Sequence, residues 1–159
     1  MLLSLHRRKR LDGPVLVVLP TSLLGNWANE LGKWAPELKV SKYHGDSRAA
    51  LRRANAKRPV KKPGFDVLLC PYQIFEKTSQ SAKIDRGFVG KWSYHALILD
   101  EAHCLKDVES NRFKKIAELQ ARWKLLLTGT VFQNTLKELI SVVSTCGRRA
   151  GRSAGLTFR

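Results

Sequence analysis

The sequence predicts an α/β fold in which a mostly parallel sheet is flanked by helices. Two aliphatic runs without polar alternation, Pro14 to Leu19 and Ala96 to Leu99, are typical of strands buried on both faces of such a sheet. Amphipathic segments with helical spacing separate the apolar runs, and strands that alternate with helices favour parallel pairing. At 159 residues, the chain has room for one domain with a sizeable core.

The first predicted strand, over residues 14–19, leads into an amphipathic helix that starts at about Ser22 and ends at Pro36. The apolar residues of this helix recur at spacings of three and four and share one face: Leu24, Trp27, Leu31 and Trp34. Because Trp27 and Trp34 belong to that face, we expect both rings to pack in the core rather than to stack on bases.

The middle of the chain carries two more predicted strands and one basic helix. The strands cover residues 38–43 and 65–70, and the helix covers residues 48–56. A loop rich in proline and lysine separates this helix from the second of the two strands. The polar segment over residues 76–91 shows no clear period, so no element is predicted there.

The last third of the chain continues the alternation. A helix is predicted over residues 111–120, with Phe113, Ile116 and Ala117 facing inward, and a short strand follows over residues 125–127. A final amphipathic helix is marked by four apolar residues: Leu136, Leu139, Ile140 and Val143. Residues 147–159 change abruptly to Gly, Arg, Ser and Ala, which predicts a basic disordered tail.

The charge of the chain favours a polyanionic partner such as nucleic acid. Lys and Arg number 29 against 13 Asp and Glu, which gives a net charge of +16. The excess is uneven, because residues 42–62 hold eight Lys or Arg and a single acid, Asp46. Arg52 and Arg53 in the predicted basic helix are candidate DNA contacts, and the alternative is a solvated basic surface.

Cysteine usage and hydropathy exclude several classes of protein. Three cysteines without a C-x-x-C pair indicate neither a disulfide framework nor a zinc site, and they favour a reducing compartment. No stretch is long and apolar enough for a membrane span, so we expect no membrane partner. The basic run Arg7 to Arg10 is typical of a nuclear import signal or of a basic helix end.

Two carboxylates directly follow the buried strand that ends at Leu99. Ligands of parallel sheets bind at the carboxyl ends of the strands, where Asp100 and Glu101 stand. Phosphoryl transfer needs one carboxylate to hold a metal and another group to orient the attacking water. This pattern predicts the magnesium and water site of a nucleotide hydrolase. The alternative is a surface acidic turn with a bystander histidine, His103.

Three blocks of the sequence, in this order, resemble motifs of the SNF2 family of ATP-driven double-stranded DNA translocases. Residues 14–27 (PVLVVLPTSLLGNW) resemble motif Ia, residues 97–107 (LILDEAHCLKD) motif II with its DEAH box, and residues 125–139 (LLLTGTVFQNTLKEL) motif III. Within this family, the segments HCLKD and LLLTGT favour a resemblance to the SMARCAD-type remodellers. The resemblance implies a RecA-like helicase ATP-binding lobe over residues 13–146, acting in chromatin remodelling or DNA repair in the nucleus, with nucleosomes among its partners.

The resemblance also implies roles for the residues of motif II. Asp100 would hold Mg²⁺ through its waters, and Glu101 would polarise the water that attacks the γ-phosphate of ATP. His103 would couple this site to motif III and to a second RecA-like lobe.

The resemblance gives motif III a nucleotide-linked role through Thr128, Gly129, Thr130 and Gln133. The chain departs from the family pattern here, since Val131 stands where the family has proline. A proline would restrict Thr130 to extended geometry, so the loop of this chain is expected to be looser.

Motifs Ia and Ib imply contacts to the DNA backbone. Pro20, Thr21 and Ser22 lie where motif Ia touches DNA, and a helix amino end with hydroxyl groups is a natural phosphate binder. The alternative for these hydroxyls is helix capping. Tyr72 lies in the region of motif Ib, and its alternative is a place in the core.

The phosphate-cradling sequence G-x-x-x-x-G-K-[ST] is absent from the chain. Its two Gly-Lys pairs, at Lys33 and Lys91, are each followed by tryptophan. We therefore expect an incomplete lobe that lacks the P-loop strand and the second lobe, with residues 1–12 as the basic end of a truncated helix. Such a chain alone is not expected to turn over ATP. The alternatives are a non-catalytic basic module that binds DNA or protein, and a degenerate truncated product.

Overall fold

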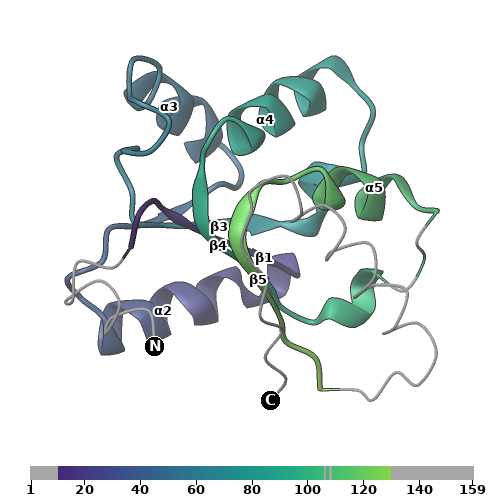
Figure 1. Cartoon of the computed structure of the whole chain (residues 1–159), viewed down its shortest axis with the longest axis horizontal. Helices are drawn as coiled ribbons and strands as arrows, with labels where there is room; N and C mark the ends of the chain where they lie inside the picture. Colours follow the sequence, from purple (N-terminus) through teal and green to yellow (C-terminus); the bar gives the residue numbers. More distant parts are fainter. Residues whose placement is uncertain (1–10, 106, 108, 130–159) are drawn as a thin grey trace.

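The computed structural model describes residues 11–105, 107 and 109–129, which form a sheet covered by helices on both faces (Figure 1). All pairings in the five-stranded sheet are parallel, and the strand order is β2-β3-β1-β4-β5. The strands are β1 (Val15–Leu19), β2 (Val40–Lys42), β3 (Val67–Pro71), β4 (Tyr94–Leu99) and β5 (Ala121–Leu126). The predicted α/β fold with a parallel sheet is thereby confirmed.

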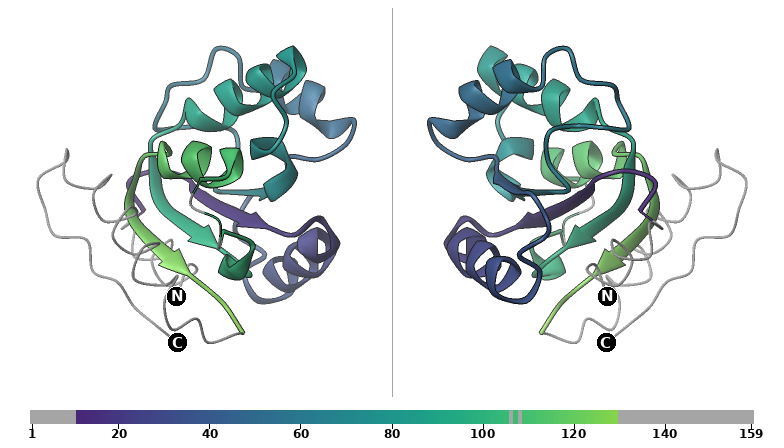
Figure 2. Two further views of the ribbon diagram at one scale, coloured as in Figure 1. Left: turned by 90° about the vertical axis from the view of Figure 1, so that its right-hand side faces the viewer. Right: turned by 90° about the vertical axis from the view of Figure 1, so that its left-hand side faces the viewer.

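Four α-helices connect the strands: α2 (Leu24–Trp34), α3 (Ser47–Ala54), α4 (Gln80–Gly90) and α5 (Asn111–Ala117). Three short 3₁₀ helices accompany them: η1 (Thr21–Leu23), η2 (Tyr72–Phe75) and η3 (Ala102–Leu105). Helix α2 lies on one side of the sheet, and α3, α4 and α5 lie on the other (Figures 1 and 2). In the described part of the chain, no helix has the length and apolar content needed to cross a membrane.

The two faces of the sheet belong to two separate apolar clusters, as the side-chain alternation of strands requires. Val15, Val17 and Leu19 face α2, whereas Leu16 and Val18 face the cluster that contains residues of α4 and α5. All five residues of β1 are fully buried. At about 1.5–3 kcal/mol for each large aliphatic side chain, this burial makes β1 the centre of the core.

Local sequence signals fix where several elements begin. The Ser79 hydroxyl accepts a hydrogen bond from the backbone N–H of Ala82 at 3.3 Å and caps α4. Ser110 caps α5 in the same way through Phe113 at 3.2 Å. Gly13 precedes β1, where a Cβ atom would lie 2.4 Å from the carbonyl oxygen of Ser93, so only glycine permits this approach.

Several predicted boundaries are wrong. Helices α3 and α5 end at Ala54 and Ala117, earlier than expected, and β5 begins at Ala121, four residues before its predicted start. The segment without a predicted element contains α4. Trp34 is 66% exposed, so the expectation that it packs in the core is wrong. The helix end predicted for residues 1–12 falls largely outside the described residues, as do the last predicted helix and the tail over 147–159.

The register of the sheet brings the carboxyl ends of the central strands to one edge. Leu19 of β1 pairs with Pro71 of β3, and Leu99 of β4 pairs with Val18 and Leu126. The residues that follow β1, β3, β4 and β5 therefore emerge next to one another. This edge carries the acidic turn, defined here as Asp100 to His103.

Candidate functional site

Backbone contacts fix the start of the acidic turn. The N–H of Asp100 donates to the carbonyl oxygen of Val18 at 2.8 Å, which extends the β1–β4 pairing by one residue. Glu101 has a φ of 50°, a left-handed conformation that is costly for a residue with a Cβ atom. Its N–H donates to Oδ1 of Asp100 at 3.0 Å. Strain of this kind, held in place by surrounding structure, is typical of functional sites.

Two aromatic side chains from other elements hold Asp100. The indole Nε1–H of Trp27, on α2, donates to Oδ2 of Asp100 at 2.7 Å. The hydroxyl of Tyr72, the first residue of η2, donates to the backbone carbonyl oxygen of Asp100 at 2.8 Å. Burial raises the pKa of the Tyr72 phenol, so this hydroxyl stays protonated and remains a donor at neutral pH. Tyr72 is 3% exposed and lies in the core, which was the alternative to its predicted DNA contact.

The other two titratable side chains of the acidic turn pair with each other. Oε2 of Glu101 lies 2.9 Å from Nδ1 of His103, and the two side chains are 36% and 41% exposed. The turn continues into η3, whose carbonyl at Cys104 accepts a hydrogen bond from Arg112 of α5 at 2.8 Å. Glu101 and His103 thus reach solvent together, while the carboxylate of Asp100 contacts α2 through Trp27.

The start of motif III lies beside the acidic turn. The N–H of Leu127 donates to the carbonyl oxygen of Leu99 at 2.8 Å, and the N–H of Ala102 donates to the carbonyl oxygen of Leu127 at 2.9 Å. Thr128, partly exposed, and Gly129, exposed, follow directly at this edge. The structure therefore brings these two predicted residues to the turn. Thr130, Val131 and Gln133 lie outside the described residues.

Asp100 fits a magnesium ion that is held through water. Among residues 11–105, 107 and 109–129, no group of three or more His, Cys, Asp or Glu side chains could hold a metal ion alone. Mg²⁺ in nucleotide sites does not require one, because it uses one or two carboxylates, several waters and the substrate phosphates. Each carboxylate oxygen of Asp100 accepts one described hydrogen bond and has a second lone pair for a metal-bound water.

The predicted motif Ia contacts lie at the same edge of the sheet, between β1 and α2. Ser22 is exposed, and Pro20 and Thr21 are partly exposed. Neither η1 nor α2 has a side-chain cap, since Pro20 and Leu23 occupy the cap positions. Capping, the alternative for these hydroxyls, is therefore not their role in this structure.

The two arginines predicted to contact DNA have different environments. Arg52 and Arg48 of α3 both pair with Asp85 of α4, whose side chain is only 3% exposed. The hydroxyl of Tyr43 donates to Oδ1 of Asp85 at 2.8 Å. We call these four residues the Asp85 clamp. Arg53, by contrast, is exposed. The clamp explains why α3 is fixed to α4, and it makes Arg52 primarily a structural residue.

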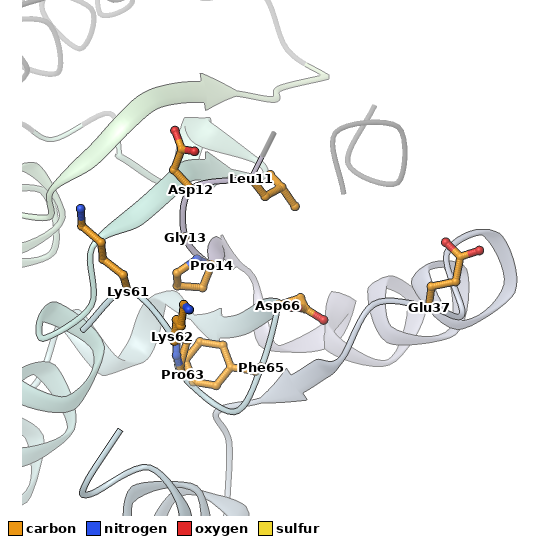
Figure 3. A pocket seen from close by; sticks show the side chains of 10 residues that line it. All are labelled: Leu11, Asp12, Gly13, Pro14, Glu37, Lys61, Lys62, Pro63, Phe65 and Asp66. Carbon is orange, nitrogen blue, oxygen red and sulfur yellow. The ribbon is translucent and has the colours of Figure 1, made fainter. Parts of the chain in front are cut away.

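A hollow of about 810 Å³ lies at the opposite edge of the sheet, where β1 and β3 begin (Figure 3). It is lined by the segment that leads into β1, with Asp12 and Gly13, and by the loop that leads into β3, with Lys61 and Lys62. Ligands of parallel sheets bind at the carboxyl ends of the strands, so this hollow is not the candidate site.

The sequence analysis missed the contact between Trp27 and Asp100. The helical period places Trp27 on the inner face of α2, and it is partly buried there as expected. Its indole N–H needs an acceptor once it leaves water, and that requirement was the available signal. The period alone could not identify an acceptor 73 residues away.

Comparisons with known proteins agree with the predicted family and fold. Residues 1–150 match the family model of the SNF2-related domain. The chain is 43% identical over 143 residues to Protein CHROMATIN REMODELING 19 of Arabidopsis thaliana, a match that covers 87% of this chain and 19% of that protein. It is 45% identical over 130 residues to a Drosophila melanogaster homolog of SWI/SNF-related matrix-associated actin-dependent regulator of chromatin subfamily A containing DEAD/H box 1, covering 80% and 15%.

A solved structure shares the fold. The SWI2/SNF2 ATPase core of Sulfolobus solfataricus in complex with double-stranded DNA superposes with a TM-score of 0.66 at 23% identity. The match covers 90% of this chain and 26% of that one. The chain therefore spans less than a third of the length of each of these three proteins.

Proposed function

The chain belongs to the SNF2-related domain family, and from that membership we propose that it is the part of an ATP-dependent double-stranded DNA translocase that carries the DEAH motif. Relatives named as a chromatin remodelling protein and an ATP-dependent helicase support a role in chromatin remodelling, and DNA repair is a second role that we propose. Such a role places the protein in the nucleus, with double-stranded DNA and nucleosomes as partners. The full activity would belong to a longer protein, as it does in the relatives.

The observation that carries this proposal is the arrangement of Asp100 and Glu101 at the carboxyl end of β4, beside Thr128. Asp100, a half-buried carboxylate with fixed geometry, would hold the waters of Mg²⁺. The ion, when bound with ATP, neutralises phosphate charge and makes the γ-phosphate a better electrophile. Glu101 would orient water toward that phosphate, and its pairing with His103 at 2.9 Å aims the carboxylate.

The same edge offers groups for DNA. Pro20 and Ser22 border the start of α2, and an exposed hydroxyl there can donate to a phosphate oxygen. Apart from this edge, Arg53 is an exposed cation near the C-terminal end of α3. Replacing Arg53 with Ala should lower the slope of log affinity against log salt concentration by about one, if it contacts a single phosphate. An unchanged slope would show that Arg53 does not contact the DNA.

Magnesium-dependent nucleotide binding tests the assignment of Asp100. A fluorescent ATP analogue is titrated with the chain in Mg²⁺ or in EDTA, and the experiment is repeated with Asp100→Asn, which keeps the size and the acceptor oxygen but removes the charge. We expect Mg²⁺ to strengthen binding to the wild-type chain and to have no effect on the variant. Equal binding in Mg²⁺ and EDTA by the wild-type chain would contradict the assignment.

A second candidate function is a non-catalytic basic module that binds DNA. The net charge of +16 favours it, because that charge supports DNA binding without nucleotide chemistry. This candidate predicts salt-dependent binding of a short DNA duplex together with no Mg²⁺-dependent binding of ATP. The proposed function predicts both.

A further inference from the structure

We propose that Trp27 is a positioning residue for the metal ligand Asp100; the inference rests on the proposed function of the acidic turn and adds a residue to it. The two side chains lie 73 positions apart in the chain and meet because α2 packs beside the carboxyl end of β4. Their donor–acceptor distance of 2.7 Å is short for a hydrogen bond from nitrogen, which is typical when the acceptor is charged.

The contact fixes which way the carboxylate faces. A free aspartate rotates about χ2 with little preference, since that torsion is broad. In this structure the N–H of Glu101 holds Oδ1 at 3.0 Å and the indole of Trp27 holds Oδ2. Because the two donors bind two different oxygens, the plane of the carboxylate is held in one orientation. The second lone pair of each oxygen then points in a set direction, which is what an ion bound through ordered waters requires.

The chemical nature of the donor matters as much as its place. An indole N–H donates a hydrogen bond but carries no charge and cannot lose its proton at physiological pH. A lysine or arginine in this position would neutralise Asp100 and compete with a cation. Within residues 11–105, 107 and 109–129, no lysine or arginine forms an ion pair with Asp100. Trp27 thus orients the ligand and leaves its negative charge available.

The helix supplies a matched control for this contact. Trp34 lies on the same helix, and its Nε1–H donates to Oε2 of Glu30, also at 2.7 Å. That pair is exposed and stays within one helix, whereas the Trp27 pair joins α2 to the acidic turn. The two tryptophans therefore make the same chemical contact, and only one of them touches a candidate metal ligand.

Mn²⁺ affinity of the full chain tests the inference without relying on ATP turnover. Free Mn²⁺ is measured by its paramagnetic resonance signal during titration of the wild-type chain, Trp27→Phe, Trp34→Phe and Asp100→Asn. We expect Asp100→Asn to lose the site, Trp27→Phe to weaken it about tenfold, as loss of an orienting partner does, and Trp34→Phe to leave it unchanged. Wild-type affinity in Trp27→Phe would overturn the inference and leave the assignment of Asp100 intact.

A ring isostere separates positioning from packing. Replacing Trp27 with benzothienylalanine keeps a bicyclic ring of similar size and substitutes sulfur for the N–H group. If Trp27 acts by positioning, this variant should show the same loss of Mn²⁺ affinity as Trp27→Phe while unfolding at nearly the wild-type denaturant concentration. Full Mn²⁺ affinity in the isostere would show that Trp27 only fills space. Mn²⁺ binding that persists in Asp100→Asn would instead show that Asp100 is not the metal ligand, and it would contradict the proposed function as well.

Discussion

Asp85 and Asp100 are two aspartates that the fold treats in opposite ways. Asp85 is buried, and its carboxylate is bound by two arginines and a tyrosine hydroxyl. Asp100 is half-buried, and within the described residues its carboxylate accepts hydrogen bonds from two neutral groups, an indole and a backbone N–H. The two arginines neutralise the charge of Asp85, and these ion pairs join α3 to α4. Neutral partners fix Asp100 and leave its charge free to act on a ligand.

The comparison is most strongly tested by Asp85→Ala. Removing this carboxylate leaves Arg48 and Arg52 facing each other without their counter-charge, and it leaves the Tyr43 hydroxyl without its acceptor. Loss of one partner of a buried ion pair costs about 3 kcal/mol or more, and we expect a loss near 3 because both arginines keep some solvent contact. Chemical denaturation measures it. Asp46→Ala is the control, because Asp46 is exposed at the start of α3 and makes no side-chain cap hydrogen bond, and it should change stability by less than about 0.5 kcal/mol.

A smaller effect of opposite sign is expected at Glu101. Its φ of 50° costs a residue with a Cβ atom about 1 kcal/mol relative to glycine. Glu101→Gly and Glu101→Ala both lose the contact with His103, so the difference between them isolates the backbone term. We expect the glycine variant to be the more stable by about 1 kcal/mol in denaturant unfolding. Equal stability of the two variants would show that the turn is not strained.

The smallest effect on stability is expected for Asp100→Asn. The amide oxygen of asparagine can still accept from Trp27 or from Glu101, so the free energy of unfolding should change by less than about 1 kcal/mol. The contrast with the loss of about 3 kcal/mol at Asp85 would then separate a functional carboxylate from a structural one. If Asp100→Asn lowers the free energy of unfolding as much as Asp85→Ala does, Asp100 is a structural carboxylate like Asp85.

The sequence was sufficient to predict the fold because the relevant signals are local. The unbroken apolar runs of β1 and β4 predict a buried parallel sheet, and the DEAH motif follows β4 at the predicted edge. Helix α4 was missed because its inner face contains Asp85 between Ala82 and Phe88, which breaks the apolar period. The start of β5 was missed for a related reason, since Arg122 and Lys124 interrupt its apolar pattern.

The candidate site was only partly predictable. Asp100 and Glu101 could be identified because adjacent residues at a strand end form the motif. The partners of Asp100 could not, since Trp27 and Tyr72 come from distant segments and a helical or strand period says nothing about where a polar tip points. The same limit led to the wrong prediction for Trp34, which shares the spacing of the apolar face but is exposed at the last position of α2.

The strand order has a consequence for the synthesis of the protein on the ribosome. Of the five described strands β1 is translated first, yet its two neighbours in the sheet are β3 and β4, and β2, which follows it in the chain, pairs with β3 instead. One edge of β1 therefore has no strand partner until Val67 of β3 is synthesised, and the other has none until Ala96 of β4 is synthesised. Until then a fully apolar segment has unpaired backbone groups, the situation in which strands of different chains associate. The risk that β1 associates with another chain is therefore greatest between the translation of β1 and that of β4.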